Sequence, residues 1–212
     1  MRNLDFIYKR HSVRKFEEKN VPVEDIKKII EAATYAPSGK NVQNWHFVAL
    51  TNKEKIEKVG EIIEKKNADL ANLLQNEDMK NRFTKFLRFS TVFTKAPVLI
   101  LVYTETSYKP TGLDVLKEIG VSTEEVHDLL KTNPAIQNIG AATENLMLAA
   151  TDMGYGTCWM TSANYAAKEI EEFIGLDKEG YFLAAMTPLG IPSGEPKSPP
   201  RKPIDEVLTI IE

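Results

Sequence analysis

The segment Val98-Leu99-Ile100-Leu101-Val102 is a continuous run of aliphatic residues, and three of the five are β-branched. A short apolar run without polar alternation is typical of a strand that is covered on both faces. A second apolar run, His46–Leu50, follows a polar loop and predicts a further buried strand. The segments Gly156–Met160 and Tyr181–Met186 also read as strands. The sequence therefore predicts a sheet whose central strand lies between two layers.

Helical patterns occur before, between and after these strands. Apolar residues recur at helical spacing after Pro22, and that helix is expected to end before Pro37. The polar stretch 52–88 predicts two or three surface helices, and Asn133-Pro134 opens a long helix that reaches about Met153. Residues 166–175 also look helical. Because helices and strands mix without a regular alternation, the sequence favours an α+β fold over a doubly wound Rossmann fold.

The whole chain, residues 1–212, is expected to form one domain, because it has no repeat, no low-complexity block and no linker. Between residues 105 and 131 the periodic signal is weak, and a mobile cover over a site is one interpretation of that stretch. Residues 191–212 contain five prolines and are expected to form an extended carboxy-terminal arm.

Composition narrows the function classes. The chain has 27 basic and 30 acidic residues, a formal charge of −3, and a pI near 5.8, which argues against a dedicated nucleic-acid binder. The single cysteine, Cys158, excludes an intrachain disulfide and a cysteine-based zinc cage. The longest apolar stretch, Ala96–Tyr103, is shorter than the roughly 20 residues of a membrane span. Because no secretory signal is visible either, we expect a cytoplasmic protein without a membrane or nucleic-acid partner.

Several common catalytic motifs are absent or incomplete. Gly39-Lys40 lacks the other residues of a P-loop, and Gly154-x-Gly156 lacks the third glycine of a dinucleotide fingerprint. The three histidines show no metal-ligand spacing, so no metal site is expected. Cys158 lies in an apolar run, which is typical of a small core residue and not of a nucleophile.

The first informative motif is Arg10-His11-Ser12-Val13-Arg14. In an extended segment, alternation places Arg10, Ser12 and Arg14 on one face. Two guanidinium groups and a hydroxyl on one side would suit a phosphate monoester. The alternative is a solvated basic turn. Arg201-Lys202 is a second basic point near the end of the chain, and the sequence does not show whether the two clusters meet.

The second motif runs from Ala36 to Trp45 and contains Ser38, Asn41, Gln43 and Asn44. Such a dense group of short donors and acceptors could hydrogen-bond the edge of a planar ring system. These side chains could equally satisfy the backbone of a turn, which is the commoner role of serine and asparagine.

Taken together, these stretches resemble the FMN-dependent nitroreductase family. Arg10–Arg14 is similar to the family's amino-terminal signature, and Ala36–Phe47 is similar to its second signature. Gly154–Met160 resembles the family's strand beside the flavin, and Pro188–Pro203 resembles its carboxy-terminal segment. The four matches follow the family's order along nearly the whole chain.

The resemblance implies an α+β fold with a mixed or antiparallel sheet wrapped by helices, in an intertwined homodimer with FMN at the subunit interface. Twelve residues are then expected at the flavin, and no side chain is expected to act as an obligatory nucleophile or base. They are Arg10, His11, Ser12, Arg14, Pro37, Ser38, Asn41, Asn138, Trp159, Met160, Thr161 and Arg201.

Each of these residues inherits a role from the family's pattern. The resemblance assigns the arginines and Ser12 to the ribityl phosphate and His11 to the ribityl chain or ring. Residues 37, 38 and 41 would come from the partner subunit. Residues 159–161 would line the isoalloxazine mainly through backbone groups, and Asn138 would face the flavin. Pro199 departs from the pattern, because a basic residue commonly stands there, so the phosphate would depend on the amino-terminal arginines or on Lys202.

The implied activity is an FMN-dependent oxidoreductase that uses NAD(P)H to reduce nitroaromatics, quinones or related small aromatic acceptors by ping-pong hydride transfer. Other chemistry within the family is an alternative: dehalogenation, ring oxidation or flavin destruction. A flavin carrier or sensor without turnover is a further alternative. The sequence does not identify the acceptor or the preferred nicotinamide cofactor.

Overall fold

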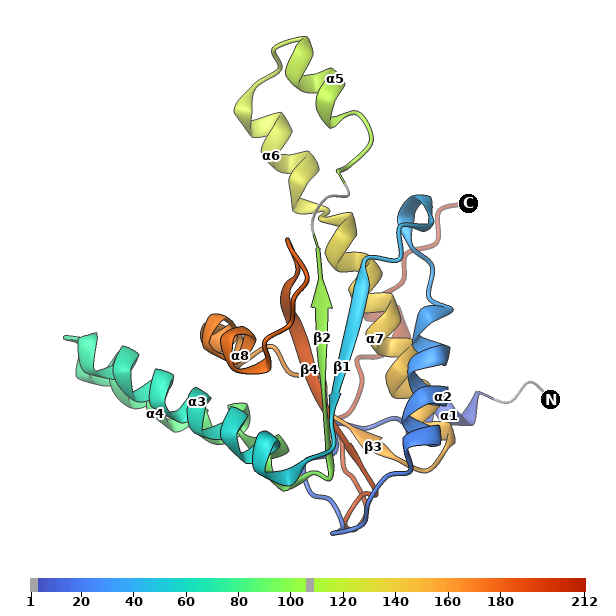
Figure 1. The fold of residues 1–212 in the computed structure, drawn as a ribbon. Helices are drawn as coiled ribbons and strands as arrows, with labels where there is room; N and C mark the ends of the chain where they lie inside the picture. The colour runs from blue at the N-terminus through green and yellow to red at the C-terminus, as the bar shows by residue number, and fades with distance from the viewer. Residues whose placement is uncertain (1–3, 106–108) are drawn as a thin grey trace.

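The computed structural model describes residues 4–105 and 109–212 and has four strands in one sheet, with helices on both faces (Figure 1). The strands are β1 (Trp45–Leu50), β2 (Val98–Thr104), β3 (Gly156–Thr157) and β4 (Phe182–Gly190). Their order is β1-β2-β4-β3, and each neighbouring pair is antiparallel. The expected α+β architecture with an antiparallel sheet is therefore confirmed.

The central position of the apolar run 98–102 is also confirmed, because β2 pairs with β1 on one side and with β4 on the other. All seven residues of β2 are buried. The strand continues beyond the apolar run to Tyr103 and Thr104, both fully buried. β3 is much shorter than the predicted strand 156–160, and the backbone rejoins β4 only at Met160, which pairs with Met186.

The structure describes eight α-helices and four short 3₁₀ helices. The α-helices are α1 (Asp5–Lys9), α2 (Val23–Thr34), α3 (Lys53–Leu73), α4 (Glu77–Ser90), α5 (Leu113–Glu118), α6 (Thr123–Lys131), α7 (Pro134–Asp152) and α8 (Ala167–Ile174). The 3₁₀ helices are η1 (Gly39–Asn41), η2 (Val92–Lys95), η3 (Asn164–Ala166) and η4 (Ile204–Glu206). No helix in the part of the chain that the structure describes is long and apolar enough to cross a membrane.

The weak stretch 105–131 contains two short helices, α5 and α6, that stand away from the sheet (Figure 1). Residues 106–108 of the expected cover lie outside the described residues. A capping box begins α6: the Ser122 hydroxyl accepts from the Glu125 amide, and the Glu125 carboxylate accepts from the Ser122 amide. Few apolar residues of this pair are buried: Leu113 is the one buried residue of α5, and α6 has none.

One face of the sheet is covered by α2 and α7. Their inward residues, among them Ile29 and Leu146, form one core with Ile100 and Val102 of β2. Burial of a large aliphatic side chain contributes about 1.5–3 kcal/mol, so this face is held mainly by apolar contact. These contacts fix the position of the long helix α7 against the sheet.

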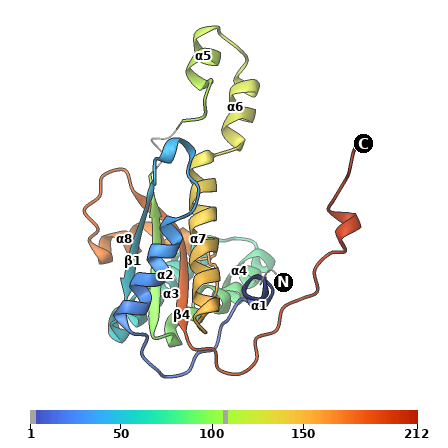
Figure 2. The same cartoon turned by 90° about the vertical axis from the view of Figure 1, so that its right-hand side faces the viewer.

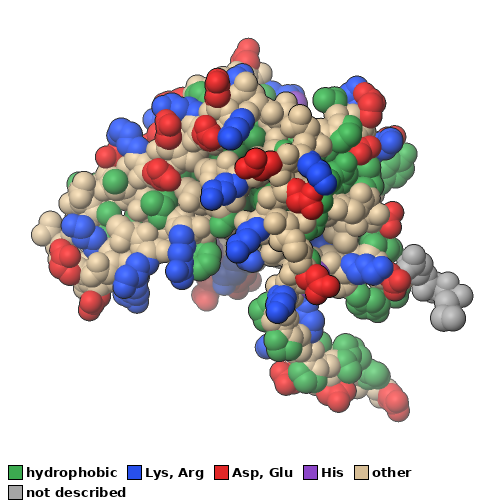
Figure 3. Space-filling model, turned by 90° about the horizontal axis from the view of Figure 1, so that it is seen from below, with side chains coloured by type: hydrophobic (Ala, Val, Ile, Leu, Met, Phe, Trp, Pro, Cys, Tyr) green, Lys and Arg blue, Asp and Glu red, His purple; other side chains and the backbone are tan. Residues whose placement is uncertain are grey.

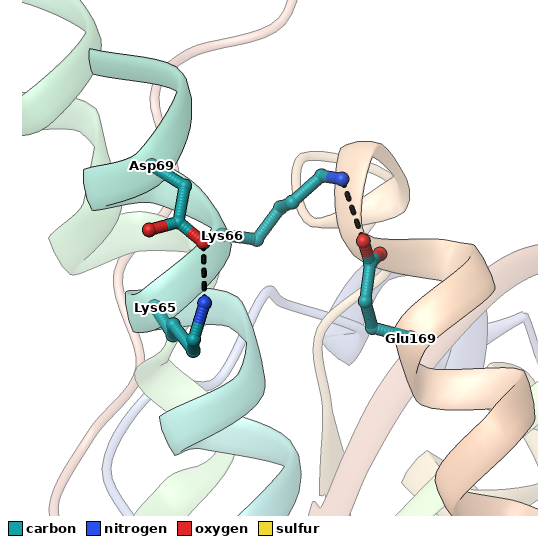
Figure 4. A network of polar contacts seen from close by, with 4 residues as sticks. All are labelled: Lys65, Lys66, Asp69 and Glu169. Atoms are coloured by element: carbon teal, nitrogen blue, oxygen red, sulfur yellow. Dashed lines mark hydrogen bonds and ion pairs between the residues drawn. The ribbon is translucent and has the colours of Figure 1, made fainter. Parts of the chain in front are cut away.

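The other face is covered by α3 and α8, and α3 continues with α4 into a hairpin that projects from the body (Figure 1). A polar link ties α3 to α8, because the Lys66 ammonium donates to the Glu169 carboxylate at 2.5 Å (Figure 4). Beside it, Lys65 donates to Asp69 at 2.6 Å within α3. The inner end of the hairpin is therefore attached by both apolar and charged contacts.

Beyond β4 the chain first runs beside the amino-terminal segment and then leaves the body (Figure 2). The Glu17 amide donates to the Ile191 carbonyl at 2.9 Å, and the Ser193 amide donates to the Lys15 carbonyl at 2.9 Å. All residues from 193 to 212 are exposed. Apart from η4, this arm has no regular secondary structure.

Acidic and basic side chains are interspersed on the surface seen from below (Figure 3). This mixture agrees with the small net charge of −3. Local clusters are therefore more informative about ligands than the overall field of the protein.

Candidate functional site

The motif Arg10–Arg14 lies in an extended segment against the edge strand β3. The Val13 amide donates to the Thr157 carbonyl at 2.8 Å, and Ser12 forms a parallel bridge with Thr157. A Cβ atom on Gly156 would lie 2.6 Å from Val13 Cγ2, so only glycine permits this close approach. The buried side chain of Val13 fixes the inward direction, which leaves its neighbours Ser12 and Arg14 on the other side.

Arg10, Ser12 and Arg14 alternate along the extended segment and share the face opposite buried Val13. Burial raises the pKa of the nearby Cys158 thiol, whereas the charges of Arg14 and Arg10 and a hydrogen bond with Ser12 act in the opposite direction. This pattern of effects agrees with the shared face. Two cations and a hydroxyl in one place form a suitable donor set for a dianionic phosphate.

The contacts of this cluster leave much of its hydrogen-bonding capacity available. Arg10 Nε lies 3.7 Å from Glu144 Oε1 on α7, which is an ion pair beyond close hydrogen-bond distance. One Arg14 nitrogen, Nη1, donates to the Ser12 carbonyl at 3.2 Å, and the side chain is exposed. His11 Nδ1 lies 2.7 Å from the Ser198 hydroxyl, so His11 contacts the arm. An arginine has five N–H donors, and these contacts use few of them.

The second motif forms a tight loop around η1. Lys40, Asn41 and Gln43 have φ angles of 53°, 54° and 47°, a left-handed conformation that is uncommon for residues with a side chain. The Ser38 hydroxyl accepts from the Gln43 amide at 3.2 Å, and the Ser38 carbonyl accepts from the Asn41 amide at 2.9 Å. Ser38 thus supports the turn, while Pro37 and Asn41 are exposed at its surface.

Two buried asparagines hold this loop on the body. Asn138 Nδ2 donates to Asn44 Oδ1 at 2.9 Å, and Asn138 Oδ1 accepts from the Gly39 amide at 3.2 Å. Asn44 Nδ2 donates in turn to the Thr104 hydroxyl at 2.8 Å and to the Ala135 carbonyl at 3.1 Å. Both side-chain amides are therefore engaged within the protein. In this structure Asn138 positions the loop, which is a different task from the expected contact with a flavin.

Residues 159–161 alternate between exposed and buried. The Met160 amide and carbonyl both bond to Met186 at 2.9 Å, and the Met160 side chain is buried, so its groups are engaged in the sheet and core. Trp159 and Thr161 are exposed on either side of it. A Cβ atom on Gly140 would lie 3.7 Å from Trp159 Cη2, which places the indole beside α7.

Helix α7 relates the clusters to one another. Gly140, beside Trp159, and Glu144, beside Arg10, are four residues apart and share one face of the helix, about 6 Å along its axis. Asn138, which holds the loop of η1, is six residues from Glu144 and points about 120° away. One chain therefore presents the Arg10 cluster and Trp159 on one side of α7 and the 37–43 loop on another.

The last predicted residue, Arg201, is not brought to the Arg10 cluster. It lies in the exposed arm and forms no ion pair with the residues at 4–105 and 109–212. Within the same ranges, no group of three His, Cys, Asp or Glu side chains could hold a metal ion.

Comparison with known proteins places this geometry in a family. The sequence pattern of the nitroreductase family matches residues 7–191. The chain belongs to the nitroreductase family. Its fold matches the crystal structure of a BluB-like flavoprotein from Clostridium difficile 630, with a TM-score of 0.94, 45% identity and full coverage of both chains.

Two other members differ more in sequence. A nitroreductase with bound FMN from Desulfitobacterium hafniense DCB-2 has a TM-score of 0.71 and 25% identity, with full coverage of both chains. A putative NADH dehydrogenase/NAD(P)H nitroreductase from Archaeoglobus fulgidus is 26% identical over 194 residues, which are 91% of this chain and 86% of that protein. The protein is therefore an oxidoreductase-family flavoprotein, and the expected family membership is confirmed.

Sequence analysis did not identify Glu144, which pairs with Arg10 but lies 134 positions away, so no local pattern connects them. For Asn44 it left two roles open, binding of a ring edge and support of a turn. In the structure Asn44 is buried and bonds to Asn138, which holds the loop. An asparagine that directly precedes an apolar strand is a weak signal for such a buried anchor.

Proposed function

We propose that this chain is a single-domain, FMN-dependent oxidoreductase that uses NAD(P)H to reduce nitroaromatics, quinones or related aromatic acceptors. The observation that carries this proposal is the extended segment Arg10–Arg14 on β3, where buried Val13 leaves Ser12 and Arg14 together on the opposite face and Arg14 Nη1 reaches the Ser12 carbonyl at 3.2 Å. This donor set fits the phosphate of FMN. Membership of the nitroreductase family and the FMN-bound relative support the choice of flavin.

The residues of the chain bind and orient the cofactor. Arg10 and Arg14 hold the phosphate through charged hydrogen bonds, and Ser12 adds a hydroxyl donor. His11, which contacts Ser198 of the arm, would lie beside the ribityl chain or ring. Trp159 and Thr161 line the ring. Met160 between them is fixed to β4 by its two backbone bonds to Met186, which leaves both neighbours on the exposed side. Bound FMN supplies hydride transfer between NAD(P)H and the acceptor, so no protein nucleophile is required.

We further propose that the functional unit is an intertwined homodimer. Five large apolar side chains in the arm are 53% to 93% exposed, although such residues are normally buried. They are Ile204, Val207, Leu208, Ile210 and Ile211. The outer edge of β1 is unpaired within the described chain, and a β-branched apolar segment is suited to join such an edge.

The arrangement around α7 also favours two subunits. The Arg10 cluster and the 37–43 loop lie on different sides of that helix, which favours completion of the site by the loop of a partner subunit over completion by the loop of the same chain. A loop from a partner subunit, with Pro37, Ser38 and Asn41, would supply the missing side. In the same way, Arg201 would reach the phosphate only if the arm took a different course or came from the partner.

The test begins with the protein as isolated. A flavin absorption spectrum, followed by NAD(P)H oxidation with 4-nitrobenzoate or menadione, is the expected result. FMN-saturated protein that oxidises neither nicotinamide with any nitroarene or quinone would contradict the proposal. Stopped-flow mixing separates an enzyme from a flavin sensor, because the reduced cofactor of a sensor is not rapidly reoxidised by small organic acceptors.

A dilution experiment tests the shared site. Analytical ultracentrifugation with flavin detection should show FMN sedimenting with the dimer and appearing free when dilution splits it. If a demonstrated monomer keeps its FMN, each subunit holds a complete site and the dimer model is wrong.

A further inference from the structure

A groove of about 500 Å³ lies between the loop of η1 and the segment that leads into α5. Its lining residues come from two stretches about 70 positions apart in the chain. They are Lys40, Val42, Lys109, Pro110, Thr111, Gly112, Asp114 and Val115. The volume lies within the range of about 300–1,000 Å³ that is typical of small-molecule sites. Neither the phosphate cluster nor Trp159 contributes to this groove.

The lining combines positive charge with apolar surface. Lys40 and Lys109 bring two ammonium groups, and Asp114 is the one carboxylate among the lining residues. Lys109 forms no ion pair with any other residue that the structure describes. Val42, Pro110 and Val115 offer surfaces on which a planar ring can lie. A negatively charged group attached to a ring system matches this combination.

The Lys40 side of the groove is held in an unusual backbone conformation. Lys40 has φ 53° and ψ 21°, and its neighbours are tied down by the Ser38 carbonyl and by Asn138. Strained backbone of this kind persists where the surrounding structure enforces it, and it is common at ligand sites. Because the loop is already ordered, a ligand would bind there without the cost of ordering it.

We propose that this groove binds the anionic group of the small molecule that reacts at the flavin, and that Lys40 and Lys109 recognise its charge. The inference rests on the proposed function, which places the neighbours of Lys40, Ser38 and Asn41, at the flavin. The shared chemistry is a phosphate or carboxylate on a molecule with a planar ring. The 2′-phosphate of NADPH and the carboxylate of an anionic aromatic acceptor are its two sources.

The experiment compares substrates that differ by one anionic group. NADPH is paired with NADH, and 4-nitrobenzoate is paired with nitrobenzene, using the FMN-loaded protein. The variants are Lys40→Gln and Lys109→Gln, with Lys40→Arg and Lys109→Arg as charge-preserving versions. Lys117→Gln is the matched control, because Lys117 is an exposed lysine of α5 outside the groove lining.

The expected result is a rise of about tenfold in KM for the anionic member of at least one pair, with kcat and the neutral member unchanged. The arginine versions should restore binding, and Lys117→Gln should resemble the unaltered protein. A shift confined to NADPH identifies the cofactor as the source of the anion, and a shift confined to 4-nitrobenzoate identifies the acceptor. Equal KM values in all variants for both pairs would overturn the inference.

This design separates the groove from the proposed function. If the unaltered protein turns over nitrobenzene but the lysine variants show no charge-dependent change, the groove proposal fails and the proposed function stands. If the unaltered protein oxidises neither nicotinamide with any nitroarene or quinone, the proposed function fails. Calorimetric titrations with NADPH and with 4-nitrobenzoate then decide on the groove: weaker binding of either anion to Lys109→Gln than to Lys117→Gln supports the inference, and equal binding of both overturns it.

Discussion

Strand β2 and the carboxy-terminal arm are both rich in aliphatic residues, yet the structure treats them in opposite ways. All seven residues of β2 are buried between two helical layers. Every residue of the arm from 193 to 212 is exposed, including Ile211 at 93%. Similar side chains therefore stabilise the subunit in one region and remain uncovered in the other.

This difference indicates that the two regions belong to different folding units. β2 is satisfied by contacts within its own chain, with β1 and β4 as neighbours. The contacts of the arm among the described residues lie in its first half, where residues 191–193 bond to the amino-terminal segment and Ser198 contacts His11. An apolar tail that its own subunit does not cover is typical of a surface that contacts another molecule. We therefore expect substitutions in β2 to change the unfolding equilibrium of the subunit, and substitutions in the arm to change the association of subunits.

Truncation after Lys202 should have the largest effect of the changes proposed here, because it removes the whole exposed apolar tail. It removes the apolar tail but keeps Arg201, and we expect loss of the dimer and release of FMN. The far-UV circular dichroism and the denaturant midpoint of the FMN-free monomer should change little, because every residue of the removed tail is exposed in the single chain. Sedimentation and flavin retention measure the first effect. Full-length Arg201→Ala is the control for loss of charge in the arm. A truncated protein that stays dimeric with FMN bound would show that the apolar tail is not needed for the dimer.

Leu101→Ala and Leu208→Ala make the same chemical change in the two regions. Leu101 is fully buried, so its truncation should lower the free energy of unfolding by about 2–5 kcal/mol. Leu208 is 53% exposed, and its truncation should leave monomer unfolding unchanged while weakening the dimer. Chemical denaturation of the FMN-free monomer checks the first result. A comparable loss from both substitutions would show that the arm is part of the folded subunit.

Arg14→Ala tests whether Arg14, which lies beside the first part of the arm, belongs to the phosphate site. Loss of a hydrogen bond to a charged group should weaken FMN binding by about 1.5–3 kcal/mol. Quenching of FMN fluorescence on binding measures the affinity. Lys19→Ala removes an equal charge from the same segment outside the cluster and should have little effect. Unchanged FMN affinity in Arg14→Ala would remove this residue from the phosphate site.

The smallest expected effect concerns the link between α3 and α8. The hydrogen bond from Lys66 lowers the pKa of Glu169 from its ordinary value of 4.5. A lowered folded-state pKa contributes stability above pH 4.5, and this contribution is lost as the pH falls through the lowered value. Both side chains are about one-third exposed, so Glu169→Gln should cost less than about 1 kcal/mol near neutral pH.

Urea denaturation at pH 7 and below pH 4 measures this pH dependence. The difference between Glu169→Gln and the unaltered protein should be present at pH 7 and should shrink in acid. Glu172→Gln, on the exposed side of the same helix, is the control. A difference that is constant across this range would show that the lost contact is not ionic.

Much of the fold was predictable because apolar patterning is local. The run 98–102 marked the central strand, and helical spacing marked α2 and α7. The predicted strand 156–160 was wrong in length, because the Cys158 amide donates to the Thr187 hydroxyl at 3.1 Å and not to a strand carbonyl. That bond joins residues 29 positions apart, so the local pattern does not show it.

The candidate site was predictable in part for the same reason. Alternation along Arg10–Arg14 was enough to predict a shared face for Arg10, Ser12 and Arg14, and in the structure this segment is extended along β3 with Val13 buried on the opposite face. The position of Asn138 was not predictable, because its two bonds reach Asn44 and Gly39, which are 94 and 99 positions away. The roles of these residues toward FMN remain predictions.

The spacing between Asn138 and Glu144 on α7 limits how this protein can change over time. An inserted residue between them would rotate the two ends of the helix by about 100° relative to each other. Glu144 would then turn away from Arg10 whenever Asn138 kept its hold on the loop. The α3–α4 hairpin projects from the body and can gain or lose turns at its tip, whereas this part of α7 tolerates substitution but no insertion or deletion.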